Sequence, residues 1–310
     1  MQEIIAPIEK QVIENELTND KLLRSSNNGE NLIYVVTAHD SPNIMREIGR
    51  LREFTFRSAG GGTGKDCDID QYDTSENCYK QLIVWDPKEK EIVGGYRFMH
   101  GKDAKRDENG IYQFGTSGLF TLSEKFISDY LPYTVELGRS FVQPNFQPTK
   151  DSRKGIFSLD NLWDGLGAIM IENPDMKYFF GKVTMYPHYN RKARNLVLYF
   201  INKYFPDNEK LVYPINPLLT FTEADHFDEV FIGNSYEEDY KILVSNVREL
   251  NTGIPPLVNA YMNLSPTMRY FGTSLNNTFG EVEETGILVN VNHIHPSKKE
   301  RHVNTYIPKK

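Results

Sequence analysis

The fold is decided by residues 134–143, TVELGRSFVQ, a stretch bracketed by prolines. Hydrophobic strand formers dominate it, so it predicts a buried β-strand. Two charged residues, Glu136 and Arg139, lie inside it on either side of Gly138. Strand side chains alternate between faces, but a bulge at the glycine would bring both charges to one face. Two interpretations stay open: an ion pair that only stabilises the fold, or a functional pair.

Composition narrows the class of protein. The chain has 310 residues, 39% hydrophobic and 25% charged, as in ordinary globular proteins. The net charge of −7 argues against general nucleic-acid binding. Its two cysteines, Cys67 and Cys78, lack ligand spacing, so we expect no metal site and no disulfide framework. The chain shows no signal-peptide pattern and no apolar run of about 18 residues, so we expect a cytoplasmic protein.

Periodicity and turn signals give the element order. Helices are predicted at 8–23, 42–56, 123–129, 158–170, 190–204, 223–230, 236–250 and from Pro255 onward. Strands are predicted at 31–38, 81–85, 91–99, 134–143, 178–185, 268–273 and 285–291. We expect a polar arm at 1–30, one domain at 31–295 with a helical insertion near 206–262, and a basic tail at 296–310.

Two motif-like stretches do not fit the sites they suggest. Residues 60–65, GGGTGK, do not have the spacing of a phosphate-binding loop, and Asp66 stands where Ser or Thr is needed. We favour a mobile loop that covers a substrate. The acidic run that follows begins like an EF-hand loop, but Gln71 and Asn77 replace its glycine and its closing glutamate.

The element order is that of the GNAT acyltransferase fold, and short motifs add to the resemblance. They resemble those of the acyl-homoserine-lactone synthases and, still more closely, of the ornithine and glycine lipid N-acyltransferases often labelled hemolysin-like. The motifs are Leu51-Arg52-x-x-x-Phe56, Asp70-x-x-Asp73, Gly94-Gly95-Tyr96-Arg97, Glu136-Leu137-Gly138-Arg139-x-Phe141-Val142 and Pro255-Pro256-Leu257-Val258 with Phe279-Gly280. The resemblance covers about residues 31–295 and implies an α/β (α+β) fold with a mixed central sheet flanked by helices.

The resemblance also implies a reaction. It points to an N-acyltransferase that moves a long-chain fatty acyl group, with or without a 3-hydroxyl, to the α-amine of an amino acid such as glycine or ornithine. The product would be an N-acyl amino acid lipid precursor. No acetyl-CoA loop pattern follows the central strand, so acyl carrier protein is expected as donor rather than CoA. The co-substrate would be its acyl-phosphopantetheine thioester, with no permanently bound cofactor.

Two other functions stay open. One is an acetyl-CoA-dependent GNAT enzyme acting on a small amine or a protein lysine. The other is a non-catalytic acyl-binding module. In any of these cases the fold alone does not fix the function. For a lipid-forming enzyme we also expect weak peripheral contact with the inner membrane, through the basic tail or the arm.

The resemblance assigns roles to particular residues. We expect Glu136 to orient the attacking amine and Arg139 to hold Glu136, with pantetheine between 136–143 and 178–185. Arg52 and Arg97 are candidates for the acceptor carboxylate, because arginine binds carboxylates through two parallel hydrogen bonds. The alternative is that they pair with Asp70 or Asp73. The full substrate-binding set is Arg52, Phe56, Asp70, Asp73, Arg97, Phe141 and Val142.

An acidic carrier protein would need a local basic patch on this acidic chain. Basic residues flank both sides of the proposed pantetheine position. They are Lys150, Arg153, Lys154, Arg191 and Arg194, with Lys182 and Lys192 nearby. The alternative is a solvated loop and helix face.

Overall fold

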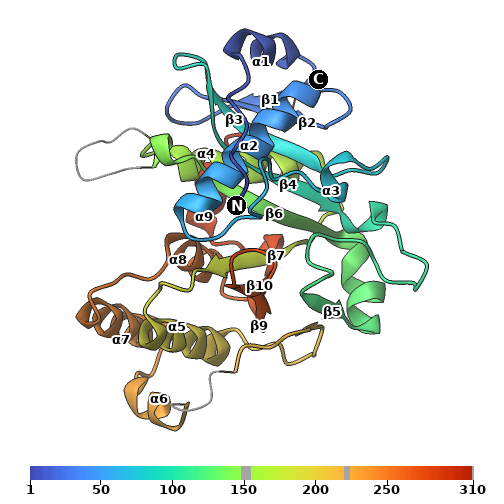
Figure 1. The fold of residues 1–310 in the computed structure, drawn as a ribbon. Helices are drawn as coiled ribbons and strands as arrows, with labels where there is room; N and C mark the ends of the chain where they lie inside the picture. Colours follow the sequence, from blue (N-terminus) through green and yellow to red (C-terminus); the bar gives the residue numbers. More distant parts are fainter. Residues whose placement is uncertain (148–154, 220–223, 309–310) are drawn as a thin grey trace. The chain divides into compact units, whose positions relative to one another are not determined.

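A computed structural model describes residues 1–147, 155–219 and 224–308 (Figure 1). The chain forms two compact units. The first comprises Met1–Gly115, Leu131–Lys177 and His295–Lys310, and the second comprises Thr116–Tyr130 and Tyr178–Ile294.

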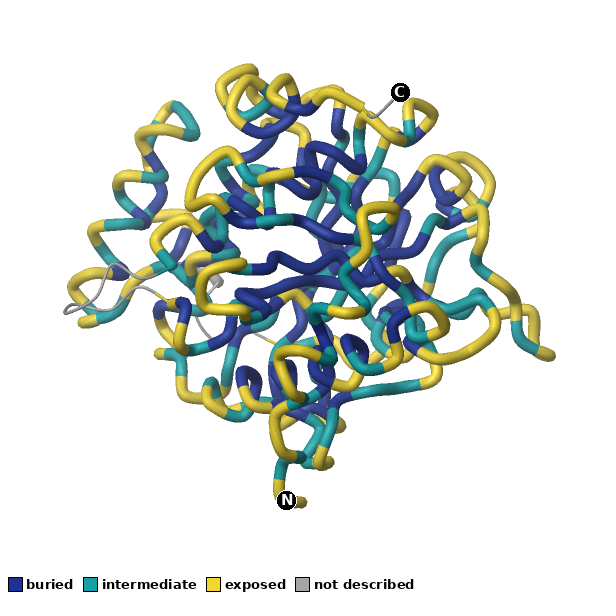
Figure 2. The backbone as a smooth tube through the Cα atoms, turned by 90° about the horizontal axis from the view of Figure 1, so that it is seen from above, coloured by how far each residue is buried: buried dark blue, intermediate teal, exposed yellow. Residues whose placement is uncertain are grey.

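The first unit is built on an antiparallel sheet. Its strands are β1 (Leu22–Ser25), β2 (Leu32–Val36), β3 (Lys80–Asp86), β4 (Glu91–His100) and β6 (Thr134–Val142), in that order across the sheet. The hairpin of β3 and β4 turns at residues 87–90, and Lys90 has a positive φ of 55°. Buried backbone, dark blue in Figure 2, is concentrated in such strands.

Two long helices cover opposite faces of this sheet. On β3, Gln81 accepts a hydrogen bond from Arg52 of α2 (Pro42–Ser58) at 2.5 Å. The next residue, Leu82, packs closely against Gly165 of α4 (Ser158–Glu172). A Cβ added at Gly165 would lie 2.7 Å from Cδ1 of Leu82. Because neighbouring strand residues point to opposite faces, α2 and α4 must lie on different sides of β3.

Three short helices complete the first unit. They are α1 (Lys10–Glu16), α3 (Gln71–Thr74) and α9 (Pro296–His302). The α9 backbone packs against Gly167 of α4, and buried His302 Nδ1 lies 2.7 Å from Asp164 Oδ1. The expected basic tail therefore contains a helix that packs on the first unit.

The second unit has a three-stranded antiparallel sheet of order β7-β10-β9. Its strands are β7 (Tyr178–Met185), β9 (Arg269–Asn276) and β10 (Val282–Asn290), and a separate pair joins β5 (Phe120–Leu122) to β8 (Val212–Pro214). Its helices are α5 (Arg191–Tyr204), α6 (Ala224–Val230), α7 (Tyr236–Glu249) and α8 (Pro256–Met262), with a short π-helix at Phe126–Tyr130. Aromatic side chains fill its interior, such as Phe126 against Phe180 at 5.4 Å between ring centroids.

Most predicted elements are confirmed, and the structure differs from the prediction in two places. The helix expected at 8–23 is shorter, because Leu22–Ser25 forms the edge strand β1. The short pair β5–β8 was not predicted. The parallel partner expected for β6 is β7, which lies in the other unit, so that pairing stays a prediction, as does the division into arm, domain and tail.

Candidate active site

A cluster of charged side chains lies in the first unit, where α2, α3, β4 and β6 contribute charged residues and β3 contributes the neutral Gln81. Arg52 comes from α2, and Asp73 comes from α3. The N-cap of α3 is Asp70, which forms a capping box with Asp73. This box fixes the acidic segment so that its carboxylates meet the arginines of the sheet.

Arg52 and Asp73 form the buried base of the cluster. Arg52 Nη1 lies 3.1 Å and 3.2 Å from the two carboxylate oxygens of Asp73, and both side chains are 0% exposed. Gln81 Nε2 donates to the same carboxylate at 2.9 Å. Burial acts to raise the pKa of Asp73, but Arg52 and then Arg97 more than offset it, so the pKa is lowered. Asp73 is therefore ionised throughout the ordinary working range.

Arg97 lies on β4 beside this base. Its Nη1 lies 2.8 Å from Asp70 Oδ1 and 3.2 Å from Asp73 Oδ2. Its guanidinium also lies over the rings of Tyr72 and Tyr79, at 5.4 Å and 5.0 Å from their centroids. Burial acts to lower the pKa of Arg97, but the two aspartates raise it above its ordinary value. The alternative left open by the sequence, pairing with Asp70 or Asp73, is thus realised for Arg52 and Arg97 alike.

The bulge predicted in β6 is confirmed. Gly95 of β4 pairs with Phe141, whereas Arg97 pairs with Gly138, so two residues of β6 oppose Tyr96. Arg139 takes a left-handed conformation there, with φ of 52°. Its Nε lies 2.9 Å from Asp68 Oδ2 and its Nη2 lies 3.7 Å from Asp70 Oδ2. The bulge therefore directs Arg139 toward the acidic segment, while its expected contact with Glu136 stays a prediction.

Glu136 lies in the same cluster and is 1% exposed. Its Oε2 accepts a hydrogen bond from the hydroxyl of Tyr79, a fully buried residue that precedes β3. That hydroxyl also accepts from the backbone N–H of Gly115 at 2.9 Å. Sequence reasoning identified Glu136 but missed Tyr79 and Gln81, because no local pattern marks them. It also missed Asp68, whose acidic run was compared only with a calcium-binding loop.

The three remaining predicted binding residues are apolar and differ in burial. Phe56 on α2 is 8% exposed and Phe141 on β6 is 4% exposed. Val142, which pairs with Gly94, is half-buried. A Cβ at Gly94 would lie 2.4 Å from the Phe141 carbonyl oxygen, so the glycine permits this close approach of strands.

The glycine-rich loop is tied to a carboxylate of its own unit. Glu53 Oε2 accepts from the N–H and the hydroxyl of Thr63 at 3.0 and 2.7 Å, and Oε1 accepts from the N–H of Gly64 at 2.7 Å. Burial acts to raise the pKa of Glu53, but bonds from Thr63 and Arg57 more than offset it and lower the pKa. The N–H donors of Thr63 and Gly64, which a phosphate loop would offer to its ligand, are thus already used. This agrees with the sequence, which lacks the spacing of a phosphate-binding loop.

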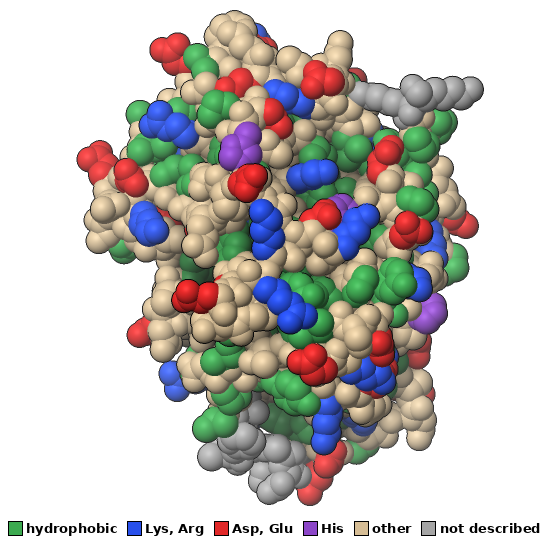
Figure 3. Space-filling model, turned by 90° about the vertical axis from the view of Figure 1, so that its right-hand side faces the viewer, with side chains coloured by type: hydrophobic (Ala, Val, Ile, Leu, Met, Phe, Trp, Pro, Cys, Tyr) green, Lys and Arg blue, Asp and Glu red, His purple; other side chains and the backbone are tan. Residues whose placement is uncertain are grey.

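The predicted docking residues are divided between two places. Lys150, Arg153 and Lys154 lie outside the described residues. In the second unit, Arg191 and Lys192 are exposed at the start of α5. Arg194 forms an ion pair with Glu283, and Lys182 forms one with Glu284. Figure 3 shows basic and acidic side chains interspersed on the face drawn, so a docking patch on that face would be small.

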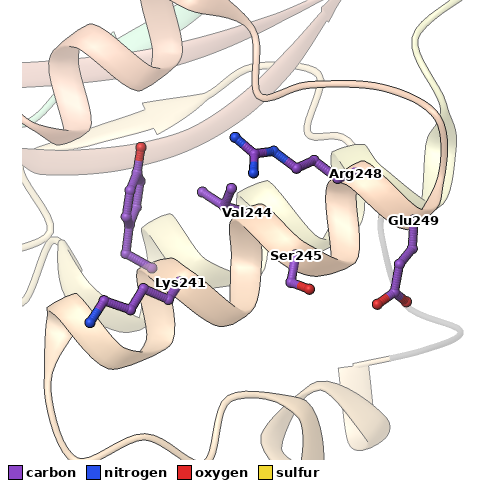
Figure 4. Close-up of a pocket in the computed structure, with 6 residues that line it drawn as sticks. Lys241, Val244, Ser245, Arg248 and Glu249 are labelled. Carbon is purple, nitrogen blue, oxygen red and sulfur yellow. The ribbon is translucent and has the colours of Figure 1, made fainter.

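A hollow of about 570 Å³ lies along α7 in the second unit (Figure 4). Its lining is Tyr240, Lys241, Val244, Ser245, Arg248 and Glu249, all from one helix. None of the residues predicted from the sequence lies there. Across the described parts of the chain, no group of His, Cys, Asp and Glu is placed to hold a metal ion. Within the same parts, no helix has the length and hydrophobicity to cross a bilayer.

Comparisons with known proteins show the family of the chain. The profile of the acetyltransferase (GNAT) domain family matches residues 51–153, which include all its arginines. The chain is 55% identical over 307 residues to a glycine N(alpha)-acyltransferase of Phocaeicola vulgatus, covering 99% of this chain and 94% of that protein. It is 54% identical to a glycine N(alpha)-acyltransferase of Bacteroides thetaiotaomicron, covering 99% and 91%. These matches confirm the GNAT fold and the acyltransferase activity expected from the sequence.

Solved structures are more distant. The AHL synthase LasI has 11% sequence identity and a TM-score of 0.44, covering 91% of this chain and 100% of that one. FeeM, an N-acyl amino acid synthase from uncultured soil microbes, has 10% identity and a TM-score of 0.30, covering 54% and 77%. With TM-scores below 0.5, these structures say nothing about how the site of this chain is arranged.

Proposed function

Because the chain belongs to the glycine N(alpha)-acyltransferase family, we propose that it transfers a fatty acyl group from a carrier-protein thioester to the α-amine of glycine. The observation that carries the proposal is identity of 55% over 99% of the chain. The product is an N-acylglycine, a precursor of amino-acid lipids.

The reaction joins an amine to a thioester carbonyl. The amine must be neutral to attack, although the α-amine of a free amino acid is mostly protonated near neutral pH. The C–N bond forms, the C–S bond breaks, and the amine proton ends on the departing thiolate. No nucleophilic side chain is needed, because the acyl group passes directly between the substrates.

Glu136 is the residue we assign to the attacking amine. Its carboxylate orients the amine, directly or through one water, and stabilises positive charge on nitrogen as the bond forms. Arg139, which lies at the bulge, supplies a positive charge beside that carboxylate. Bulged residues leave regular strand pairing, so backbone N–H groups after Gly138 supply donors for the oxyanion.

Exposure suggests how the acceptor is held. Arg52 is 0% and Arg97 3% exposed, so an acceptor carboxylate would have to displace an aspartate to reach either of them. Arg139 is 16% and Asp70 27% exposed, and these two lie side by side. We therefore place the carboxylate of glycine at Arg139 and its amino group near Asp70. Because Glu136 is only 1% exposed, it would act on that amino group through one water.

Two features of the chain favour acyl carrier protein as the donor. The pattern that holds acetyl-CoA in many GNAT enzymes is missing after β6, which favours a pantetheine carried by a protein. Exposed Arg191 and Lys192 at the start of α5 offer positive charge for an acidic carrier. Lys150, Arg153 and Lys154 are proposed for the same contact.

The test is a direct competition of donors and acceptors. Purified protein is given a long-chain acyl carrier protein, the matching acyl-CoA, or acetyl-CoA, each with glycine, ornithine or a lysine peptide. Mass spectrometry identifies the products. We expect N-acylglycine from the carrier-bound donor. A faster reaction with acetyl-CoA, or a preference for ornithine or lysine, would overturn the proposal.

A further inference from the structure

Tyr79 links Glu136 to the backbone at Gly115. The residue is fully buried at 0% exposure. Its hydroxyl donates to Glu136 Oε2 and accepts from the N–H of Gly115 at 2.9 Å. A phenol has one proton to donate, so Tyr79 gives its only donor to this carboxylate.

The ring of Tyr79 is held on two sides, which fixes where the hydroxyl points. The guanidinium of Arg97 lies 5.0 Å from its centroid. The ring of Tyr72 meets it edge-on, with 5.9 Å between centroids and an interplanar angle of 74°. A tyrosine held in this way brings its hydroxyl to one position without further loss of freedom when substrate binds.

The hydroxyl also stays protonated. Burial, followed by the nearby charge of Glu136, raises the pKa of Tyr79 well above its ordinary value. The hydrogen bond to Glu136 is therefore present across the pH range in which an acyltransferase works.

We infer that Tyr79 is a positioning residue for acyl transfer: it fixes the Glu136 carboxylate in the direction from which that carboxylate orients the amine. The inference rests on the role proposed for Glu136. Tyr79 itself touches neither substrate. Its contribution is to keep one carboxylate oxygen bound and so to set the side-chain rotamer of Glu136.

The test is Tyr79→Phe, which keeps the ring contacts and removes only the hydroxyl. A hydrogen bond to a charged group stabilises more than one between neutral groups. Its loss should therefore lower kcat by about tenfold or more, with little change in the KM for glycine. Losing a donor to the charged form raises the pKa of a carboxylate, so the acidic limb of the pH–rate profile should move to higher pH. Tyr34→Phe is the matched control, because Tyr34 is a buried tyrosine of β2 outside the cluster.

A double variant separates positioning from general damage. If Tyr79 acts through Glu136, Tyr79→Phe should cost little more once Glu136→Gln is present. Additive losses with an unchanged pH profile would overturn the inference. If Tyr79→Phe does not fold, 3-fluorotyrosine at position 79 replaces it. This stronger donor should move the acidic limb to lower pH, and an unmoved limb would count against the inference.

Failure of this inference differs from failure of the proposed function. Full activity in Tyr79→Phe with a large loss in Glu136→Gln rejects only the role of Tyr79. If the unmodified protein makes no N-acylglycine, both proposals fall.

Discussion

Replacing Asp73 by Asn tests whether the buried arginines serve the fold or the acceptor. Asp73 is fully buried and accepts from Arg52 at 3.1 and 3.2 Å. It also accepts from Gln81 at 2.9 Å and from the N–H of Asp70 at 3.1 Å. Its second cation is Arg97 at 3.2 Å. One carboxylate therefore compensates two buried guanidinium groups and completes the capping box of α3.

The amide keeps the shape of the side chain but loses the charge. Removing one partner of a buried ion pair costs about 3–5 kcal/mol. Because Asn keeps one oxygen acceptor, we expect the free energy of unfolding to fall by about 3 kcal/mol, the lower end of that range. Urea denaturation followed by tryptophan fluorescence measures it, since Trp85 and Trp163 both lie in the first unit. Exposed Asp103→Asn is the control.

The stability difference between the unmodified protein and Asp73→Asn should also depend on pH. The pKa of Asp73 is lowered in the folded protein, whereas that of an aspartate in the unfolded chain is about 3.9. The ionised carboxylate therefore stabilises the fold above that pH, and the stabilisation is lost as pH falls below it. The stability difference between the unmodified protein and Asp73→Asn should narrow below about pH 4. A stability loss under about 1 kcal/mol, or a difference that widens in acid, would refute the structural role of Asp73.

Three further predictions concern activity and the loop. Glu136→Gln should fold normally and lose about two orders of magnitude in kcat, with a changed pH–rate profile; full activity would return Glu136 to a structural role. Arg191→Glu should slow turnover with carrier-bound donors most at low salt, whereas Arg248→Glu on α7 should not; equal rates in both would exclude docking at α5. Glu53→Gln should speed amide hydrogen exchange at Thr63 and Gly64, because their N–H groups lose a charged acceptor; unchanged exchange would show that the loop is held otherwise.

Much of the first unit could be predicted because its information is local. Residues 134–143 carry the strand pattern and the glycine that marks the bulge, and both are confirmed in β6. In the second unit, α5 could be predicted for the same reason: Asn190 caps the helix by accepting hydrogen bonds from the N–H groups of Lys192 and Ala193. Strand formers, caps and interior glycines act over a few residues, so a sequence shows them directly.

The rest could not be predicted because it depends on contacts between distant residues. Tyr79 meets Glu136 across 57 positions, and no spacing rule links them. Glu53 lies in the predicted helix 42–56, where no pattern marks it, yet it is buried and accepts from the N–H of Gly64 in the glycine-rich loop. Whether Arg52 and Arg97 would bind an acceptor or an aspartate was likewise undecidable from order alone, because both need the same geometry.

The net charge of the cluster affects which amino acids can serve as acceptors. Within the described residues, three guanidinium groups meet four carboxylates, counting Asp68, Asp70, Asp73 and Glu136. When all are ionised, the set is one negative charge in excess. An acceptor with an acidic side chain would add like charge at close range, whereas glycine brings an amino group and no side chain. Discrimination against aspartate and glutamate would then arise from electrostatic repulsion, without any steric filter.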